Sequence, residues 1–405
     1  KKDPKVKVLI APDGMNNFGN YLDPQSTFNR YNFTHWSQID VLNWFAGTAT
    51  QTINIPARPW VEAAHKNGVK VIGSVFLAIS RFGGNADTLA QLVKRDESGA
   101  FPAAHKLVEI AEFYGFDGWL MNQETDLTRV KDENNELIFL SRDFDRAEKL
   151  AAQMQQFMAY LTRIAPPNME IHWYDSMVMD GTVRWQNALN SKNKMFFQQG
   201  SGLQGRVSDA IFLNYWWDEK MLNATSSLAI ALGRSRYDVY SGIDLWPDRK
   251  AQSMFVETEW LSNIFPGNGQ KALTSIALFA NNVNFNFDGN TKLAALSQYR
   301  TNKQDHRSFY DAETRFFSGD DLNLATKDEK NEWSGIGHFV PAKSTLTSLP
   351  FITHFNTGHG LLKANKGKVV VQEWHNMAEQ EALPTWQFAV YVNIITKLYY
   401  YFYHP

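Results

Sequence analysis

Helical segments that alternate with short, buried, β-rich runs constrain the fold of this chain more than any other feature of its sequence. Residues 60–66 predict a helix, Asn67-Gly68 ends it as a left-handed cap, and residues 69–77 predict a buried strand. The pattern recurs in residues 144–161, where apolar side chains repeat at three- and four-residue steps. Such alternation is typical of βα units that build a parallel sheet.

About eight parallel strands are expected, at residues 5–11, 39–45, 69–77, 116–124, 169–177, 209–217, 237–245 and 274–280. The sequence therefore predicts an α/β fold, a (β/α)8 TIM barrel with its site on the loops that follow the strands. An open doubly wound sheet is the alternative. No Gly-rich phosphate turn follows the first strand, which argues against the open sheet, and polar and aromatic residues gather at several strand ends instead.

The βα pattern weakens beyond residue 281, and the last part of the 405-residue chain has a different character. Val369-Val370-Val371 and the aromatic run at 398–403 are typical of strands. We therefore expect residues 1–340 to form the catalytic barrel. Residues 341–405 are expected to form barrel-closing loops and the start of a β-rich, β-sandwich-like region, which would be incomplete in this chain.

Charge balance and residue usage exclude several classes of function. The chain has 40 basic and 42 acidic side chains, which argues against nucleic acid as its main partner. No apolar stretch approaches the roughly 20 residues of a membrane-spanning helix. The chain has no Cys, its ten His show no metal-ligand spacing, and it contains no Gly-x-Ser-x-Gly motif. We expect neither a metal nor another cofactor.

Aromatic residues make up 14% of the chain, with 13 Trp, 15 Tyr and 28 Phe. Their rigid apolar planes suit stacking on pyranose rings, and Trp and Tyr add a polar group. A large hydrophobic core is the alternative use of the same residues. Composition alone leaves both uses open.

The most informative stretch for chemistry is residues 116–124, at the end of the fourth expected strand. Alternation places Leu120, Asn122 and Glu124 on one face, which in a barrel is the interior. Enzymes that act on 2-acetamido sugars can use the substrate's own amide oxygen as nucleophile and so need one protein acid. Glu124 would supply that acid and Asn122 would orient the acetamido group. An Asn-x-Glu at a strand end also arises by chance.

Residues 116–125 resemble the signature of glycoside hydrolase family 85, the endo-β-N-acetylglucosaminidases that cut the chitobiose core of N-glycans. The resemblance covers most of the chain. Its other segments are residues 32–36, 63–69, 173–177, 212–217, 242–244, 355–360 and 383–386.

The resemblance implies a barrel followed by β-sandwich domains and a retaining, substrate-assisted hydrolysis of N-glycans of glycoproteins or glycopeptides through an oxazoline. It implies that Glu124 is the general acid/base, that Asn122 handles the acetamido group, and that Tyr174 contributes from the next strand. Transglycosylation onto GlcNAc acceptors is an expected side activity. The match is weaker at residues 126–143, at 245–249 and after Trp386, which leaves the glycan preference open.

Two other functions stay open as alternatives. Family 18 chitinases and endoglycosidases carry Asp-Gly-x-Asp-x-Asp-x-Glu on the fourth strand. This chain keeps Asp117-Gly118 and Glu124 but has Leu120 and Asn122 at the two intervening acidic positions. The second alternative is a non-catalytic glycan-binding barrel, against which the intact pair of Asn122 and Glu124 argues.

Further candidates for sugar binding lie at the ends of later strands. They are Asp175, Asn214, Trp216, Trp217 and Asp244. Alternation sends Tyr174 and Asp175 to opposite faces without telling which one faces the site, and Asp175 could instead hold a loop as a satisfied carboxylate. Only one of Trp216 and Trp217 needs to contact sugar. A salt-bridged carboxylate is the alternative for Asp244.

The location of the protein is an expectation from its predicted substrate. Foraging on glycoproteins suggests export, so we expect a secreted, periplasmic or cell-surface protein, with the cytoplasm as the alternative. The first residues, Lys1-Lys2-Asp3-Pro4, carry no signal-peptide pattern, and a leader could have been removed before them. The sequence makes no prediction of the oligomeric state.

Overall fold

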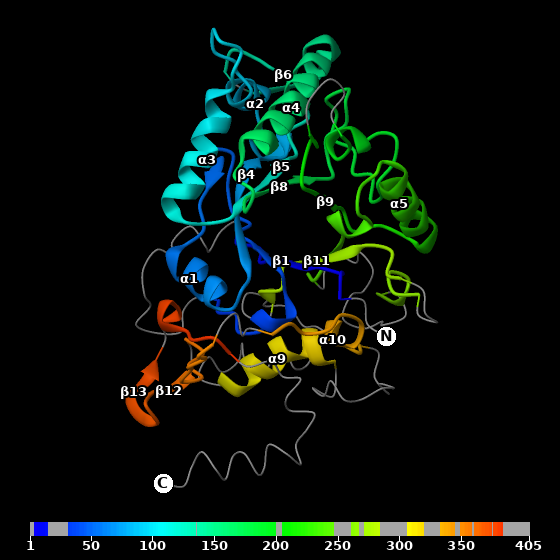
Figure 1. Cartoon of the computed structure of the whole chain (residues 1–405). Coiled ribbons are helices and arrows are strands. Elements are labelled where there is room, and N and C mark those ends of the chain that lie inside the picture. Colours follow the sequence, from blue (N-terminus) through cyan, green and yellow to red (C-terminus); the bar gives the residue numbers. More distant parts are fainter. Residues whose placement is uncertain are drawn as a thin grey trace.

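Eight parallel strands of the described chain close into a barrel in the computed structural model (Figure 1). They are β1 (Val8–Ala11), β2 (Val41–Asn43), β4 (Lys70–Leu77), β5 (Gly118–Gln123), β8 (Glu170–Tyr174), β9 (Ala210–Leu213), β10 (Val239–Asp244) and β11 (Ser275–Phe279). Their order is β2-β1-β11-β10-β9-β8-β5-β4, and β2 pairs with β4 to close the ring. The predicted (β/α)8 barrel is confirmed, and this closing pair excludes the open sheet.

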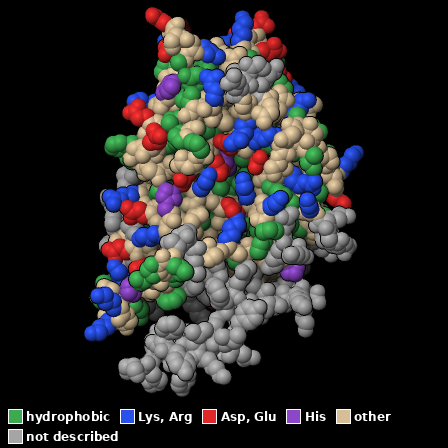
Figure 2. Space-filling model, in the orientation of Figure 1, with side chains coloured by type: hydrophobic (Ala, Val, Ile, Leu, Met, Phe, Trp, Pro, Cys, Tyr) green, Lys and Arg blue, Asp and Glu red, His purple; other side chains and the backbone are tan. Residues whose placement is uncertain are grey.

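The structure describes residues 4–14, 31–134, 136–199, 205–246, 261–266, 271–283, 306–319, 333–344, 349–358, 360–374 and 376–383. Within these residues, no helix is both long enough and apolar enough to cross a membrane. On the face drawn in Figure 2, Lys and Arg side chains are interspersed with Asp and Glu.

Helices surround the barrel (Figure 1). The α-helices are α1 (Arg58–Lys66), α2 (Ala86–Leu92), α3 (Pro102–Tyr114), α4 (Phe144–Ile164), α5 (Glu219–Ala231), α9 (His306–Ser318) and α10 (Ile336–Phe339). The short 3-10 helices are η2 (Trp36–Gln38), η3 (Ser80–Phe82), η4 (Lys194–Phe196), η5 (Arg236–Asp238) and η6 (Met377–Glu379). Local sequence sets their ends. Asp143 caps α4 by accepting a hydrogen bond from the Arg146 amide, and Gly115 ends α3 at a φ of 73°.

Side chains of the strands alternate between two hydrophobic layers. On β5, Leu120 belongs to the inner layer, whereas Trp119 and Met121 pack outward against the helices. The inner layer consists of Leu9, Ala11, Val41, Phe45, Ile72, Phe76, Ala78, Leu120, Tyr174, Ala210, Phe212, Tyr240, Ala277, Phe279 and Ala280. The expected inward face of Leu120 is therefore found, and the barrel interior is packed rather than open.

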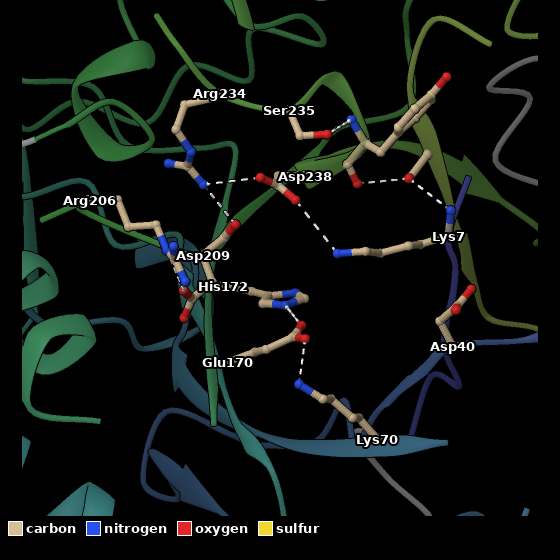
Figure 3. Close-up of polar contacts among 12 residues, drawn as sticks. Lys7, Asp40, Lys70, Glu170, His172, Arg206, Asp209, Arg234, Ser235 and Asp238 are labelled. Carbon is tan, nitrogen blue, oxygen red and sulfur yellow. Dashed lines mark hydrogen bonds and ion pairs between the residues drawn. The ribbon is translucent and has the colours of Figure 1, made fainter. Parts of the chain in front are cut away.

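A ring of polar residues closes the barrel floor, at the amino ends of the strands (Figure 3). Three aspartates that directly precede strands each accept a hydrogen bond from a main-chain amide of the neighbouring strand. Asp40 accepts from Val8 at 2.8 Å, Asp117 from Val71 at 2.8 Å, and Asp209 from Ile171 at 2.7 Å.

Ion pairs also connect residues at this end of the barrel. Lys70 and His172 both contact Glu170, at 2.7 and 2.9 Å, and Lys7 contacts Asp238 at 3.6 Å (Figure 3). The contacts on Glu170 hold the pKa of that carboxyl below its usual range, although burial opposes them. In a TIM barrel this end of the strands serves stability rather than chemistry.

The strand predicted at residues 209–217 is shorter than expected, because β9 ends at Leu213. The next main-chain amides bond to side chains instead of to a neighbouring strand. The Asn214 amide donates to Asp175 Oδ2 at 3.4 Å, and the Trp216 amide donates to Asn187 Oδ1 at 3.1 Å. Asn214, Trp216 and Trp217 therefore lie on the loop that follows β9.

Short antiparallel pairs accompany the barrel. β3 (Ile53–Asn54) pairs with β4. The weakly matching segment 126–143 contains a hairpin of β6 (Arg129–Lys131) and β7 (Leu137–Arg142). A second hairpin is formed by β12 (Gly360–Asn365) and β13 (Lys368–Trp374).

Part of the carboxyl-terminal region is tied to the barrel. Gln380 accepts hydrogen bonds from the Trp36 indole at 2.7 Å and from Lys66 Nζ at 3.0 Å, and the Leu383 amide donates to Asn67 at 3.0 Å. The barrel-closing role expected of this region stays a prediction. The boundary at residue 340 stays a prediction, and the strand expected at 398–403 lies outside the described residues.

Candidate active site

A cavity of about 760 Å³ opens at the carboxyl ends of the barrel strands. Its walls come from strand ends and from the loops that follow them. The polar and charged residues that line it are Asp13, Thr48, Arg81, Asn122, Glu124, Tyr174, Trp185, Asn214, Tyr215, Trp216 and Asp244. Leu120, Phe76, Phe212 and Phe279 of the inner layer also line it. The cavity combines apolar walls with a few convergent polar groups, as ligand sites do.

Asn122 and Glu124 project together into this cavity from the end of β5. The Asn122 Nδ2 amide donates a hydrogen bond to Glu124 Oε2 at 3.0 Å. Asn122 is only 1% exposed, whereas Glu124 is half-buried. Glu124 follows the last residue of the strand, and its main-chain amide donates to Leu77 O at 3.0 Å. A rigid strand end thus holds the carboxyl group at the cavity surface.

Trp185 contacts the other oxygen of the same carboxyl group. Its indole Nε1 donates to Glu124 Oε1 at 3.2 Å, and 40% of the side chain remains exposed. The two oxygens of Glu124 are therefore held by different donors, one deep in the cavity and one at its rim. Sequence reasoning missed Trp185 because it lies in an irregular loop where neither helical nor strand periodicity applies.

Tyr174 faces the cavity from the end of β8, the strand next to β5. Its hydroxyl donates to Asn214 Oδ1 at 2.9 Å. Burial raises the pKa of the Tyr174 phenol well above its usual value of 10, so the hydroxyl stays protonated. Met121 pairs with Trp173 in the sheet, so Asn122 and Tyr174 are the next residues on adjacent strands.

Asp175 points away from the cavity and is fully buried. Its carboxylate accepts hydrogen bonds from the amides of Gln186 at 3.1 Å and Asn187 at 2.8 Å, and from Asn193 Nδ2 at 3.0 Å. Burial raises the pKa of Asp175 to about 6, although these hydrogen bonds act to lower it. Of the two faces that alternation left open, Tyr174 occupies the cavity side and Asp175 holds a loop.

The two neighbouring tryptophans have different environments. Trp216 is 54% exposed and lines the cavity. Trp217 is 4% exposed, belongs to the hydrophobic core, and donates from Nε1 to Gly242 O at 2.8 Å. A sugar in the cavity can therefore contact Trp216 but not Trp217.

Asp244 and Asp13 are further carboxylates that line the cavity. Asp244 Oδ1 accepts from the Trp246 amide at 3.1 Å, and Asp13 Oδ2 accepts from the Trp246 indole at 2.9 Å. Across the residues that the structure describes, no three His, Cys, Asp or Glu side chains gather in a way that could hold a metal ion.

This arrangement brings a carboxyl group, a side-chain amide and a protonated phenol to one face of the cavity. The carboxyl can deliver and take up a proton, while the amide and the phenol can hydrogen-bond a polar group of a substrate. Exposed Trp185 and Trp216 add flat apolar surface at the rim. The structure thus gathers Asn122, Glu124 and Tyr174, together with Asn214, Trp216 and Asp244, and leaves Asp175 and Trp217 outside the cavity.

Comparison with known proteins adds an independent finding. Residues 15–362 match the family described as Glycosyl hydrolase family 85. The cytosolic endo-beta-N-acetylglucosaminidase of Danio rerio is 29% identical over 384 residues, which are 93% of this chain and 44% of that protein. Cytosolic endo-beta-N-acetylglucosaminidase 2 of Arabidopsis thaliana is 27% identical over 393 residues, which are 95% of this chain and 45% of that protein.

A solved structure agrees with these relatives. The glycoside hydrolase domain of Endo-D from Streptococcus pneumoniae R6 matches with a TM-score of 0.74 and 25% identity, covering 95% of this chain and 55% of that chain. The chain spans less than half the length of the curated relatives named above. The names of these relatives contradict the expectation that the protein is secreted, periplasmic or on the cell surface, and that prediction is wrong.

Proposed function

The chain belongs to glycosyl hydrolase family 85, and from this premise we propose that it is an endo-β-N-acetylglucosaminidase. Its substrate would be the GlcNAc-β-1,4-GlcNAc core of N-glycans on glycoproteins or glycopeptides. The observation that carries the proposal is the hydrogen bond from Asn122 Nδ2 to Glu124 Oε2 at the cavity surface. The names of the curated relatives support a cytosolic site of action.

The proposed reaction retains configuration and proceeds in two steps. In the first, the acetamido oxygen of the substrate attacks the anomeric carbon, Glu124 donates a proton to the leaving glycosidic oxygen, and the carbon–oxygen bond breaks. The amide nitrogen then releases its proton to solvent, and a neutral oxazoline forms. In the second step Glu124 takes a proton from water, which attacks the anomeric carbon, and the oxazoline nitrogen takes a proton back from solvent as the ring opens to the acetamide. A GlcNAc hydroxyl in place of water would give transglycosylation.

Each site residue has a proposed task in this scheme. Asn122 holds the acetamido group in line, because its amide lies beside the acid that acts on the same sugar. Tyr174 hydrogen-bonds the reacting sugar from the adjacent strand. Asn214 and Asp244 bind sugar hydroxyls, and Trp216 and Trp185 provide stacking surfaces at the rim. We further propose that residues 1–340 form the catalytic barrel and that residues 341–405 contribute barrel-closing loops and a β-rich, β-sandwich-like region.

The two alternatives have less support. A family 18 mechanism uses acidic residues where this chain has Leu120 and Asn122, and Leu120 lies in the apolar inner layer of the barrel. A glycan-binding barrel without activity would not need a carboxyl group held by two donors in the cavity.

A turnover assay tests the proposal. A labelled high-mannose glycopeptide is incubated with the protein, and released glycan is followed by mass spectrometry. We expect glycan lacking one core GlcNAc from the wild type. For Glu124→Gln we expect activity lower by several orders of magnitude, since general acid catalysis alone contributes about 10²–10⁴-fold. Glycan retained without shortening by the wild type would favour the binding module, and full activity of Glu124→Gln would remove Glu124 from the mechanism.

A further inference from the structure

We propose that Asn187 is a positioning residue that fixes Tyr174, Asn214 and the Trp216 main chain along one wall of the cavity. This inference rests on the proposed function, because it assigns Asn187 to the reaction that Tyr174 and Asn214 serve. Asn187 itself is absent from the residues that line the cavity. It acts through the residues that it holds.

The backbone of Asn187 adopts a conformation that few residues accept. Its φ is 59°, in the left-handed region, where Asn and Asp are tolerated better than other side chains with a Cβ. Its amide donates to the buried carboxylate of Asp175 at 2.8 Å, and the preceding Gln186 amide donates to the same carboxylate at 3.1 Å. Backbone strain of this kind persists where surrounding contacts impose it, and it is concentrated at functional sites.

The side chain of Asn187 joins two segments that follow different strands. Asn187 Oδ1 accepts from Asn214 Nδ2 at 2.7 Å and from the Trp216 amide at 3.1 Å. Both partners are donors, so only the amide oxygen of Asn187 can satisfy them. One oxygen thus sets the position of the loop that carries Trp216 and also the orientation of the Asn214 amide.

The orientation of Asn214 determines which way the Tyr174 hydroxyl points. Because Asn214 Nδ2 is committed to Asn187, its Oδ1 is left to accept the Tyr174 proton, and the observed distance is 2.9 Å. The hydroxyl proton is then directed at Asn214, and the lone pairs of the Tyr174 oxygen remain available to an N–H or O–H donor of the sugar. Asn187 thereby determines that Tyr174 accepts, rather than donates, a hydrogen bond in the site.

Two substitutions separate the side chain of Asn187 from its backbone. Asn187→Gly keeps the left-handed conformation, which Gly adopts freely, and removes the oxygen that holds Asn214 and Trp216. Asn187→Asp keeps both an acceptor oxygen and tolerance of positive φ. We expect Asn187→Gly to lower kcat by about 10–100-fold. Asn187→Asp is expected to retain a kcat much closer to that of the wild type. Should Asn187→Gly fail to fold, Asn187→Ser replaces it, since a serine hydroxyl is too short to reach both donors.

A double-mutant cycle with Tyr174→Phe tests the route of the effect. If Asn187 acts through the Tyr174 hydroxyl, Asn187→Gly lowers kcat by less than about threefold once that hydroxyl is gone. A loss of equal size with and without the hydroxyl would overturn the proposal, as would wild-type kcat in Asn187→Gly. The wild-type assay separates the two hypotheses, because absent turnover by the wild type refutes the proposed function and not the positioning role. In that case, an unchanged Tyr174–Asn214 contact in a crystal structure of Asn187→Gly would refute the positioning role.

Discussion

Asn122 and Trp185 bind opposite oxygens of the Glu124 carboxyl group, at 3.0 Å to Oε2 and 3.2 Å to Oε1. The first donor is buried at the end of β5, and the second lies on a loop after β8. A carboxyl group held from both sides keeps its orientation while a substrate enters. Pre-organisation of this kind lowers the barrier to proton transfer, because little rearrangement is needed during the reaction.

Asn122→Ala should separate the two steps of the proposed mechanism. The variant loses the amide that aligns the acetamido group, so hydrolysis of a glycopeptide is expected to fall by about 10²-fold or more. A preformed sugar oxazoline already contains the bond that this amide helps to form, and we expect its processing to be affected far less. Released product is measured for both substrates. Equal losses on the two substrates would contradict the assigned role of Asn122.

Trp185→Phe should lower kcat while leaving the stacking surface largely in place. The substitution removes the N–H that contacts Glu124 Oε1 and keeps an aromatic ring at the rim. We expect a loss of about tenfold, the size of one hydrogen bond of roughly 1.5 kcal/mol to a charged group. Trp185→Ala should in addition raise KM, because the ring is lost as well. An unchanged kcat in Trp185→Phe would show that the indole N–H does not serve the acid.

Trp216 and Trp217 form a matched pair for testing where sugar binds. Trp216→Ala is expected to raise KM by about fivefold with little change in stability, since an exposed ring contributes roughly 1 kcal/mol by stacking. Trp217→Phe is expected to lower the free energy of unfolding by about 1–3 kcal/mol, because Gly242 O loses its buried donor. Steady-state kinetics and urea unfolding of both variants provide the measurements. A raised KM in Trp217→Phe together with an unchanged KM in Trp216→Ala would contradict the assignment of Trp216 to the sugar.

Asp175 should make folding stability depend on pH in a direction opposite to that of a salt-bridged carboxylate. Burial raises its pKa from 3.8 to about 6 in the folded state, so the folded protein binds this proton more tightly than the unfolded chain does. Protonation of Asp175 therefore stabilises the folded state fully below pH 4. As pH rises through 6 this contribution is lost, and the free energy of unfolding falls by about 3 kcal/mol.

The matched variant for this prediction is Asp175→Asn, which has no carboxyl group to titrate. The free energy of unfolding of the wild type, minus that of the variant, is expected to decrease between pH 4 and pH 7. Urea unfolding at a series of pH values measures it. A difference that is constant over this range, or that increases with pH, would contradict the assignment.

Much of the fold could be predicted from local patterns in the sequence. Helical periodicity, helix ends at Gly115 and Pro166, and buried β-rich runs together specify βα units, and eight such strands favour a closed barrel. Alternation along β5 also placed Leu120, Asn122 and Glu124 on the cavity side. These features depend on residues close together in the chain, so the sequence contains the information directly.

The rest of the site depends on contacts between segments distant in sequence. Trp185 reaches Glu124 because Asp175 binds the main-chain amides of Gln186 and Asn187 and so positions the loop. Local sequence patterns do not predict a contact of this kind. The end of β9 at Leu213 depends on the same loop, which supplies side-chain acceptors to the residues that follow. The wrong prediction of export had no structural basis, since it was drawn from the expected substrate.

Asp40, Asp117 and Asp209, which accept hydrogen bonds from main-chain amides of β1, β4 and β8, have a practical consequence for the redesign of this protein. They fasten neighbouring strands at the end of the barrel farthest from Glu124, without drawing on any residue of the cavity. Loops at the opposite end can therefore be exchanged or randomised to alter the selectivity of the cavity, while these hydrogen bonds keep the strands in register.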